Sequence, residues 1–286
     1  MKRNPEPAVK VRVDPTNPGQ FFACCGLLEL ADRLWGGAEG WFEDREFCLD
    51  AKGKLPELLA MAKAMHLSNE SDDRTTLDEQ EEEDDKKDES QDENNALDIV
   101  APICLHLDWW KDKSLKTWAG SMNAVKIFIS MCNAIDPNNK DPLNQRQVVF
   151  DPILQADKSP THGKPKRPKK REPFYFDALR GANALPIDVG FSPDAVKITP
   201  LASPVVEALC FIGLQRCRPM PANKVRIFDY HTWAVPLDTC LAPVAVCGLL
   251  PQVYSRGYRF ENAFRTDQKK HKAFTPATPL KGENDE

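Results

Sequence analysis

The sequence predicts a mixed α+β fold in which strands and helices surround one or two cores. Residues 9–13 alternate apolar and basic side chains, a period of two that is typical of a half-buried strand. Residues 18–35 and 204–215 are apolar runs that begin with proline, a residue favoured at the first helical position. Further strands and helices follow irregularly, which favours α+β over a doubly wound sheet. A chain of 286 residues is long enough to bury such a core.

The first helix has signals at both of its ends. Asn17 is expected to be the N-cap because its side-chain oxygen can accept a hydrogen bond from a free backbone N–H, and Pro18 suits the first helical position. Gln20 is placed to complete a capping box with Asn17. Gly36 and Gly37 are expected to end the helix, since glycine adopts the left-handed C-terminal conformation at little cost.

The composition divides the chain into six segments. One is an acidic insertion without aromatic residues, which cannot bury enough apolar surface to offset the entropy of ordering. Another is a basic loop in which prolines block a helix. The predicted segments are an N-terminal α/β part (1–67), a disordered acidic loop (68–96), a strand–helix part of the same core (97–157), a flexible basic loop (158–173), a C-terminal α+β part (174–278) and a disordered tail (279–286).

Within the folded parts, hydrophobic periodicity and turn residues predict the remaining elements. Ser203 is expected to cap the second apolar helix. The other expected elements are a strand near 41–50, a helix over 55–65, a strand over 99–107, a helix over 114–134, and strands over 225–235 and 257–261.

The net charge of −5 conceals two segments of opposite charge. Residues 68–95 hold fourteen acidic and three basic residues, a net charge of −11. Residues 146–272 hold twenty basic and eleven acidic residues, a net charge of +9. A basic half of this kind can face a polyanion. The simpler interpretation is that both segments only solvate the surface.

The C-terminal half combines cations with aromatic side chains. Lysine and arginine neutralise phosphates, and aromatic rings stack on unpaired bases. Tyr175 is the stacking candidate, since Phe174 and Phe176 are expected in the core. The candidate cations of the basic loop are Lys164, Lys166, Arg167, Lys169, Lys170 and Arg171. The candidate cations of a C-terminal strip are Arg256, Arg259, Lys269, Lys270 and Lys272.

No sequence motif points to catalysis. The chain lacks the P-loop, G-x-G-x-x-G, H-E-x-x-H and G-x-S-x-G patterns. The nine cysteines include no C-x-x-C spacing, so we expect buried free thiols, no metal site and no cofactor. No stretch of eighteen apolar residues occurs, and the N-terminus leads into a strand, so we expect a cytoplasmic protein without a membrane partner.

Six short motifs are spread over most of the chain. They are residues 9–31 (VKVRVDPTNPGQFFACCGLLELA), 174–177 (FYFD), 188–192 (DVGFS), 206–215 (VEALCFIGLQ), 258–260 (YRF) and 272–274 (KAF). Together they resemble a subunit of the type I-U, also called I-G, CRISPR effector complexes. The resemblance implies a non-catalytic, large-subunit-like component of a Cascade-like complex in antiviral defence.

The resemblance also implies the partners, which are guide RNA, target DNA and other subunits of the effector complex. In such complexes guide pairing reads the target, and protein subunits hold RNA, duplex and displaced strand. The preferred role is contact with the DNA duplex beside the target, through the basic loop first and the C-terminal strip second. The chain lacks the glycine-rich loop that many guide-binding repeat subunits carry near the C-terminus, which disfavours an RNA-recognition-motif fold.

Three other functions remain open from the sequence. The chain could cap one end of the guide RNA. It could be a metal-independent endoribonuclease that processes guide precursor, with His231 as general acid or base; replacing His231 with alanine would then abolish cleavage and spare binding. A strand that alternates Tyr, His and Trp is more often structural. A protein–protein adaptor would bind no nucleic acid at low salt.

Overall fold

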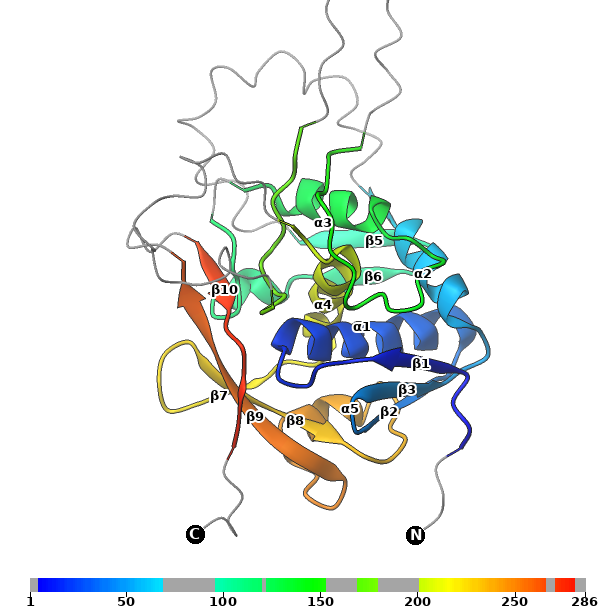
Figure 1. The fold of residues 1–286 in the computed structure, drawn as a ribbon, viewed down its shortest axis with the longest axis vertical. Coiled ribbons are helices and arrows are strands. Elements are labelled where there is room, and N and C mark those ends of the chain that lie inside the picture. The colour runs from blue at the N-terminus through cyan, green and yellow to red at the C-terminus, as the bar shows by residue number, and fades with distance from the viewer. Residues whose placement is uncertain are drawn as a thin grey trace, which may run out of the picture.

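Two buried helices form the centre of the fold. Helix α1 spans Pro18–Trp35 and helix α4 spans Pro204–Arg216, and no other pair of elements in the described part packs as extensively. Figure 1 shows both helices in the middle of the molecule. The computed structural model describes residues 5–68, 96–119, 122–152, 169–179, 201–265 and 271–280.

In the described part of the chain, three antiparallel sheets surround the helix pair. Their strand orders are β1-β3-β2, β10-β9-β8-β7 with β11 also paired to β9, and β4-β5-β6. The strands span Val9–Arg12 (β1), Glu39–Glu43 (β2), Glu46–Asp50 (β3), His66–Leu67 (β4), Leu97–Ala101 (β5), Leu105–Leu107 (β6), Met220–Pro221 (β7), Ile227–Trp233 (β8), Tyr254–Phe264 (β9), Lys272–Phe274 (β10) and Thr278–Pro279 (β11). The other helices span Leu55–Lys63 (α2), Ala124–Asn133 (α3) and Ala242–Val246 (α5), and Trp109–Asp112 forms a 3₁₀ helix (η3). The mixture confirms the predicted α+β class.

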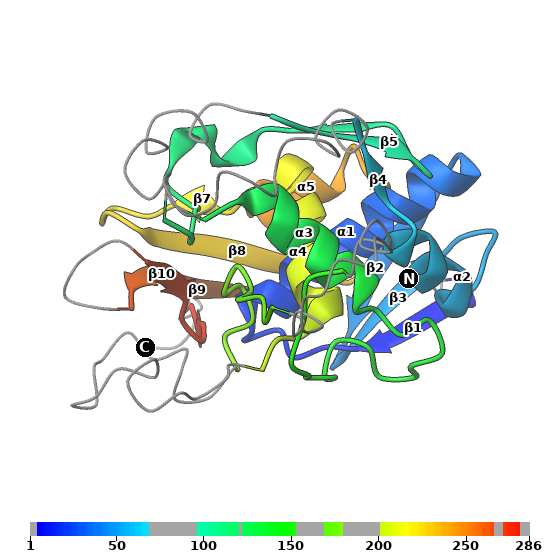
Figure 2. The same cartoon turned by 90° about the horizontal axis from the view of Figure 1, so that it is seen from above.

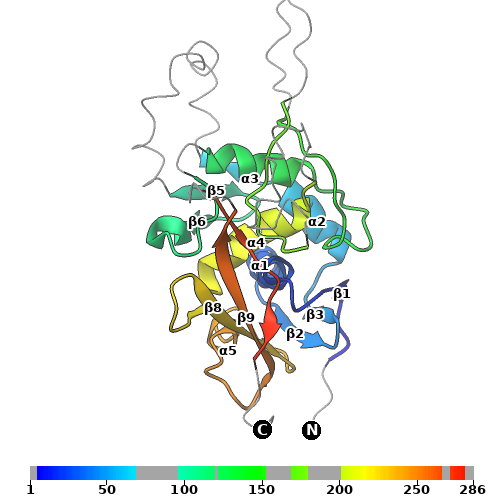
Figure 3. The same cartoon turned by 60° about the vertical axis from the view of Figure 1, so that its left-hand side comes forward.

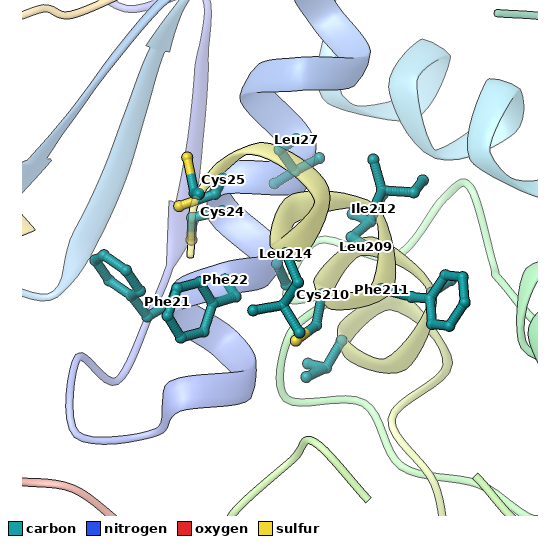
Figure 4. Packing of buried hydrophobic residues seen from close by; sticks show 14 of the residues in the cluster. Phe21, Phe22, Cys24, Cys25, Leu27, Leu209, Cys210, Phe211, Ile212 and Leu214 are labelled. Carbon is teal, nitrogen blue, oxygen red and sulfur yellow. The ribbon is translucent and has the colours of Figure 1, made fainter. Parts of the chain in front are cut away.

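A glycine on each central helix lets the two backbones meet. An added Cβ on Gly26 would lie 2.0 Å from the Leu209 carbonyl oxygen, and one on Gly213 would lie 2.1 Å from the Phe22 carbonyl oxygen. Because the opposing atoms are backbone, neither position has room for a side chain. Side chains from both helices, including Phe22 and Leu214, surround this contact (Figure 4).

One hydrophobic cluster joins buried residues from the N-terminal, middle and C-terminal folded parts. The ring of Phe211 on α4 lies 5.5 Å from that of Trp109 and 4.7 Å from that of Phe174. It also lies 5.3 Å from the ring of Phe128, because α3 packs over α4, as the view from above shows (Figure 2). The three folded parts of the sequence therefore share a core.

Gly40, on the edge strand β2 of the first sheet, makes hydrogen bonds that join this sheet to the second one. Trp233 Nε1 of β8 donates to the Gly40 carbonyl at 2.6 Å, and the backbones of Gly40 and Leu237 exchange hydrogen bonds of 2.9 and 3.0 Å. Figure 3 shows β2 and β8 on the same side of α1. The two sheets thus cover one side of the helix pair together.

The ends of α1 are formed as predicted, with one difference. Asn17 Oδ1 accepts from the Gln20 backbone N–H at 3.4 Å, and Gly36 ends the helix with φ of 66°. The capping box is absent because the Asn17 N–H donates to the Asp14 carbonyl. Gln20 Oε1 instead accepts from the Asp14 N–H at 2.8 Å.

Two predicted single strands are hairpins. The expected strand near 41–50 is formed by β2 and β3, which turn at Asp44 with φ of 50°. The expected strand over 99–107 is formed by β5 and β6, and the Ala101–Pro102 peptide bond between them is cis. Neither turn has the Asn-Gly or Asp-Gly pair that marks two-residue hairpins, so the sequence pattern predicts one continuous strand in each place.

The predicted helix over 114–134 is too long at its N-terminal end. Helix α3 begins at Ala124, where the Asn123 side chain accepts from a backbone N–H of the first turn. Asn262 of β9 donates through Nδ2 to the carbonyls of Ser114 and Lys116, at 2.9 and 3.3 Å. These tertiary hydrogen bonds hold the segment in a non-helical path, against its apolar periodicity.

Several predicted segments lie partly outside the described residues. The predicted tail 279–286 begins within β11, since Pro279 pairs with Tyr258, and 281–286 are not described. Residues 69–95 of the acidic loop, 153–157 of the strand–helix part and 158–168 of the basic loop also lie outside the described part, as do 180–200 and 266–270 of the C-terminal part, which include the motif 188–192. None of the described helices combines the length and the apolar character that crossing a bilayer requires.

Candidate nucleic-acid interface

Segment 169–179 contains the last residues of the predicted basic loop, 169–173, and it is anchored at the N-termini of both central helices. Asn17 Nδ2 donates to Asp177 Oδ1 at 2.7 Å, and Ser203 Oγ donates to Asp177 Oδ2 at 2.8 Å. All three side chains are buried. Since Asn17 precedes α1 and Ser203 precedes α4, one carboxylate lies at the start of both helices, where their dipoles favour negative charge. Ser203 therefore precedes α4 as predicted, but its hydroxyl bonds Asp177 and does not cap the helix.

A second buried carboxylate holds the same segment through its backbone. Glu207, in the first turn of α4, accepts from the N–H groups of Phe176 and Asp177, each at 3.3 Å. Arg146 Nε lies 3.5 Å from Asp177 Oδ2 and supplies a positive charge. We call Asn17, Asp177, Ser203 and Glu207 the Asp177 cluster. The Asp177 cluster therefore holds residues 176–177, close to the end of the basic loop, against the core.

Arg171 is held by hydrogen bonds to residues 149 and 151. Its guanidinium donates from Nε and Nη2 to the two carboxylate oxygens of Asp151, both at 2.6 Å, and its side chain is only 16% exposed. Its backbone N–H also donates to the Val149 carbonyl at 2.9 Å. A contact between Arg171 and a phosphate would therefore have to compete with this bidentate pair.

The predicted stacking residue, Tyr175, is buried in this structure. The residue is 3% exposed, and its hydroxyl donates to Glu172 Oε2 at 2.7 Å. The Arg265 guanidinium lies 3.4 Å from the centre of the ring and covers it. The backbone of Tyr175 has φ of 73°, an unusual conformation for a tyrosine that these contacts maintain. The ring is thus closed to base stacking, while Phe174 and Phe176 lie in the core as expected.

The described cations of the C-terminal strip differ in their surroundings. Arg256 is exposed on β9. Arg259 is also exposed, but it donates bidentately to Asp229 on β8, with both distances 2.7 Å. Lys272, at the start of β10, donates from Nζ to the Lys113 carbonyl at 3.1 Å.

The electrostatic environment of Lys272 is unusual among the candidates. Burial, together with the positive charges of Arg226 and Lys116, lowers the pKa of Lys272 to about 8. Neither Arg226 nor Lys116 was singled out from the sequence, because Lys116 lies within the predicted helix over 114–134 and Arg226 within the predicted strand over 225–235. Their effect on Lys272 depends on long-range contacts, namely the pairing of β9 with β8 and β10 and the hydrogen bond from the Lys272 N–H to the Thr117 carbonyl.

The remaining candidates are exposed or outside the described part. Lys169 and Lys170 are exposed, and the backbone of Lys170 forms an isolated antiparallel β-bridge with that of Phe150. The structure therefore gathers the described candidates on segment 169–179 and along β9 and β10. The candidates that lie outside the described residues are Lys164, Lys166, Arg167, Lys269 and Lys270.

His231 occupies a packed position on β8. Its Nδ1 lies 3.3 Å from the Val246 carbonyl oxygen, and its ring packs against Gly248 and Gly257. Within the described residues, no group of three or more histidine, cysteine, aspartate or glutamate side chains is arranged to hold a metal ion. All nine cysteines are free thiols, but Cys104 and Cys240 are exposed, contrary to the expectation of burial.

Comparison with known proteins adds no relative. A scan against protein-family models, a search of curated proteins and a search of solved structures each found no match for this chain. Its function is therefore argued from its residues and their arrangement.

Proposed function

We propose that this chain is a non-catalytic subunit of an RNA-guided CRISPR surveillance complex, in which it contacts the target DNA duplex. The observation that carries nucleic-acid contact is the net charge of +9 over residues 146–272, opposite in sign to the chain as a whole. The exposed cations Lys169, Lys170 and Arg256 are the described groups best placed to meet phosphates.

The CRISPR assignment is supported by the six motifs of the sequence analysis. Several of their residues have architectural roles: Asn17, Asp177 and Glu207 build the Asp177 cluster, and Gly26 and Gly213 allow the helix contact. The motifs therefore support a shared architecture, and the charge distribution supports contact with nucleic acid. In such a complex the protein grips the phosphate backbone, and guide pairing supplies the sequence specificity.

Neutralising the exposed cations tests the proposed contact. The triple variant Lys169→Ala, Lys170→Ala, Arg256→Ala is expected to weaken binding to duplexes of unrelated sequence equally. The slope of log K against log salt should become shallower by roughly 2 to 3, since each lost phosphate contact removes about 0.9. Fluorescence anisotropy with labelled duplexes at several salt concentrations measures both quantities.

A matched control removes charge elsewhere. Arg12 on β1 and Lys52 after β3 are exposed cations outside the basic half of the chain. The double variant Arg12→Ala, Lys52→Ala should bind duplex as the unmodified protein does. If the triple variant bound duplex with the same affinity and the same salt slope as the unmodified protein, the proposed contact would be contradicted.

A further inference from the structure

Phe150 is an exposed aromatic residue opposite the end of the basic loop. It is 43% exposed, whereas Phe128, Phe174 and Phe211 are buried in the core. Among the side chains that the structure describes, no other phenylalanine, tyrosine or tryptophan is exposed. Single exposed apolar side chains are common on protein surfaces, so the meaning of this one depends on how it is held and on its neighbours.

Hydrogen bonds fix the backbone on both sides of Phe150. The Asp151 N–H donates to the Lys169 carbonyl at 2.9 Å, and the Arg171 N–H donates to the Val149 carbonyl at 2.9 Å. The Arg171 guanidinium also donates to both carboxylate oxygens of Asp151, each at 2.6 Å. The residues before and after Phe150 are therefore bonded to the segment that ends the basic loop, and the ring projects from a held backbone.

This pairing places Phe150 and Lys170 on the same outward face. The two residues lie opposite each other in an isolated antiparallel bridge, and the two backbone hydrogen bonds flank the pair. In such a non-hydrogen-bonded pair the side chains project from one face and approach closely. Val149, the preceding residue, points to the other face and is buried. An exposed ring and an exposed lysine therefore project together.

The charge beside Phe150 indicates which ligand this ring suits. Lys169 is exposed next to Lys170, and both belong to a stretch, 158–171, whose sequence holds seven basic and no acidic residues. Such a stretch attracts a polyanion, and an aromatic face stacks on the flat face of any base. A nucleic acid with unpaired bases offers both phosphates and open base faces. In a duplex the base faces are already stacked on one another, so only the phosphates are available.

We propose that Phe150 is a stacking platform for an unpaired base of single-stranded nucleic acid, with Lys169 and Lys170 beside it to contact the phosphates. Phe150 thus takes the role that the sequence suggested for Tyr175, whose ring Arg265 covers. The site deepens the proposed function and rests on it to the extent that a nucleic acid is the ligand. An RNA-guided complex that opens a duplex supplies such a ligand, since its displaced strand has unpaired bases.

Two single-stranded probes of equal length test the platform, an oligothymidylate and an abasic strand with the same phosphate backbone. The unmodified full chain should bind the oligothymidylate more tightly, because only this strand has bases to stack. In Phe150→Ala the dissociation constant for the oligothymidylate should rise about 5- to 150-fold, the effect of losing one stacked base, and that for the abasic strand should not change. The salt slope should stay the same, since phenylalanine carries no charge. Fluorescence anisotropy measures these quantities.

Matched variants separate stacking from loss of apolar surface. Phe150→Trp keeps an aromatic face and should retain the affinity for the oligothymidylate, whereas Phe150→Leu keeps apolar bulk alone and should lose most of it. Leu249→Ala removes another exposed apolar side chain, 63% exposed and beyond α5, and should bind as the unmodified protein does. Because Phe150 and Leu249 are both exposed, the urea midpoint of each variant should stay close to that of the unmodified protein.

Equal affinity of the unmodified protein and Phe150→Ala for the oligothymidylate would overturn the site, as would an equal loss for the oligothymidylate and the abasic strand. The proposed function would still stand after either result if the triple variant of Lys169, Lys170 and Arg256 bound duplex weakly. A native complex without guide RNA would contradict the proposed function while leaving a base-dependent effect at Phe150 intact.

Discussion

Replacing Asp177 with alanine is expected to lower the free energy of unfolding by about 3 to 5 kcal/mol, because the change breaks a buried charged pair and leaves its donors unpaired. Asn17 Nδ2, Ser203 Oγ and the Leu179 N–H all donate to this carboxylate, and Arg146 lies beside it. Urea unfolding followed by circular dichroism measures the loss. Such a loss would establish that the start of each central helix depends on segment 169–179.

Two further variants refine this prediction. Asp177→Asn keeps the size of the side chain and one carbonyl oxygen, so its cost should be smaller than that of Asp177→Ala. Glu39→Ala removes an exposed carboxylate at the start of β2 and should change stability by no more than about 0.5 kcal/mol. If Asp177→Ala were as mild as Glu39→Ala, the Asp177 cluster would not be the anchor described above.

The second large effect is expected at the crossing of α1 and α4, where Gly26→Ala should destabilise the fold by about 3 kcal/mol. The added Cβ would lie 2.0 Å from a carbonyl oxygen of the facing helix, so the helices would have to separate. Whether the change raises or lowers stability distinguishes a close helix contact from an open helix surface. In a helix without such a contact, the same change would stabilise by about 1 kcal/mol through helix propensity alone.

The matched measurement is Gly213→Ala, for which the same reasoning predicts a similar loss. Ala60→Gly on the half-buried face of α2 is the control, and it should cost only about 1 kcal/mol, the propensity difference. A rise in the urea midpoint for Gly26→Ala would mean that the helices do not approach this closely.

Local signals in the sequence were sufficient for the elements with marked ends. Asn17, Pro18 and Gly36 define α1, and Pro204 defines the start of α4, because caps and proline act within a few residues. The helix over 114–134 was predicted correctly over α3 and wrongly before it, since Asn262, more than a hundred residues away, holds the first part in another path. Such tertiary contacts have no local signature.

The candidate interface was predictable in composition but not in geometry. The basic half of the chain is visible in the sequence, yet the pairing of Arg171 with Asp151 and the covering of Tyr175 by Arg265 depend on the fold. The hydrogen bond from the Lys272 N–H to the Thr117 carbonyl likewise joins segments that are far apart in the sequence. Charge is read from the sequence, whereas exposure and partners are set by long-range packing.

The most direct test of the proposed function is to purify the tagged chain from its native host and to sequence the RNA that accompanies it. The proposal predicts repeat-derived guide RNA together with several partner subunits. Recovery of the chain alone, free of guide RNA, would contradict membership of a CRISPR surveillance complex.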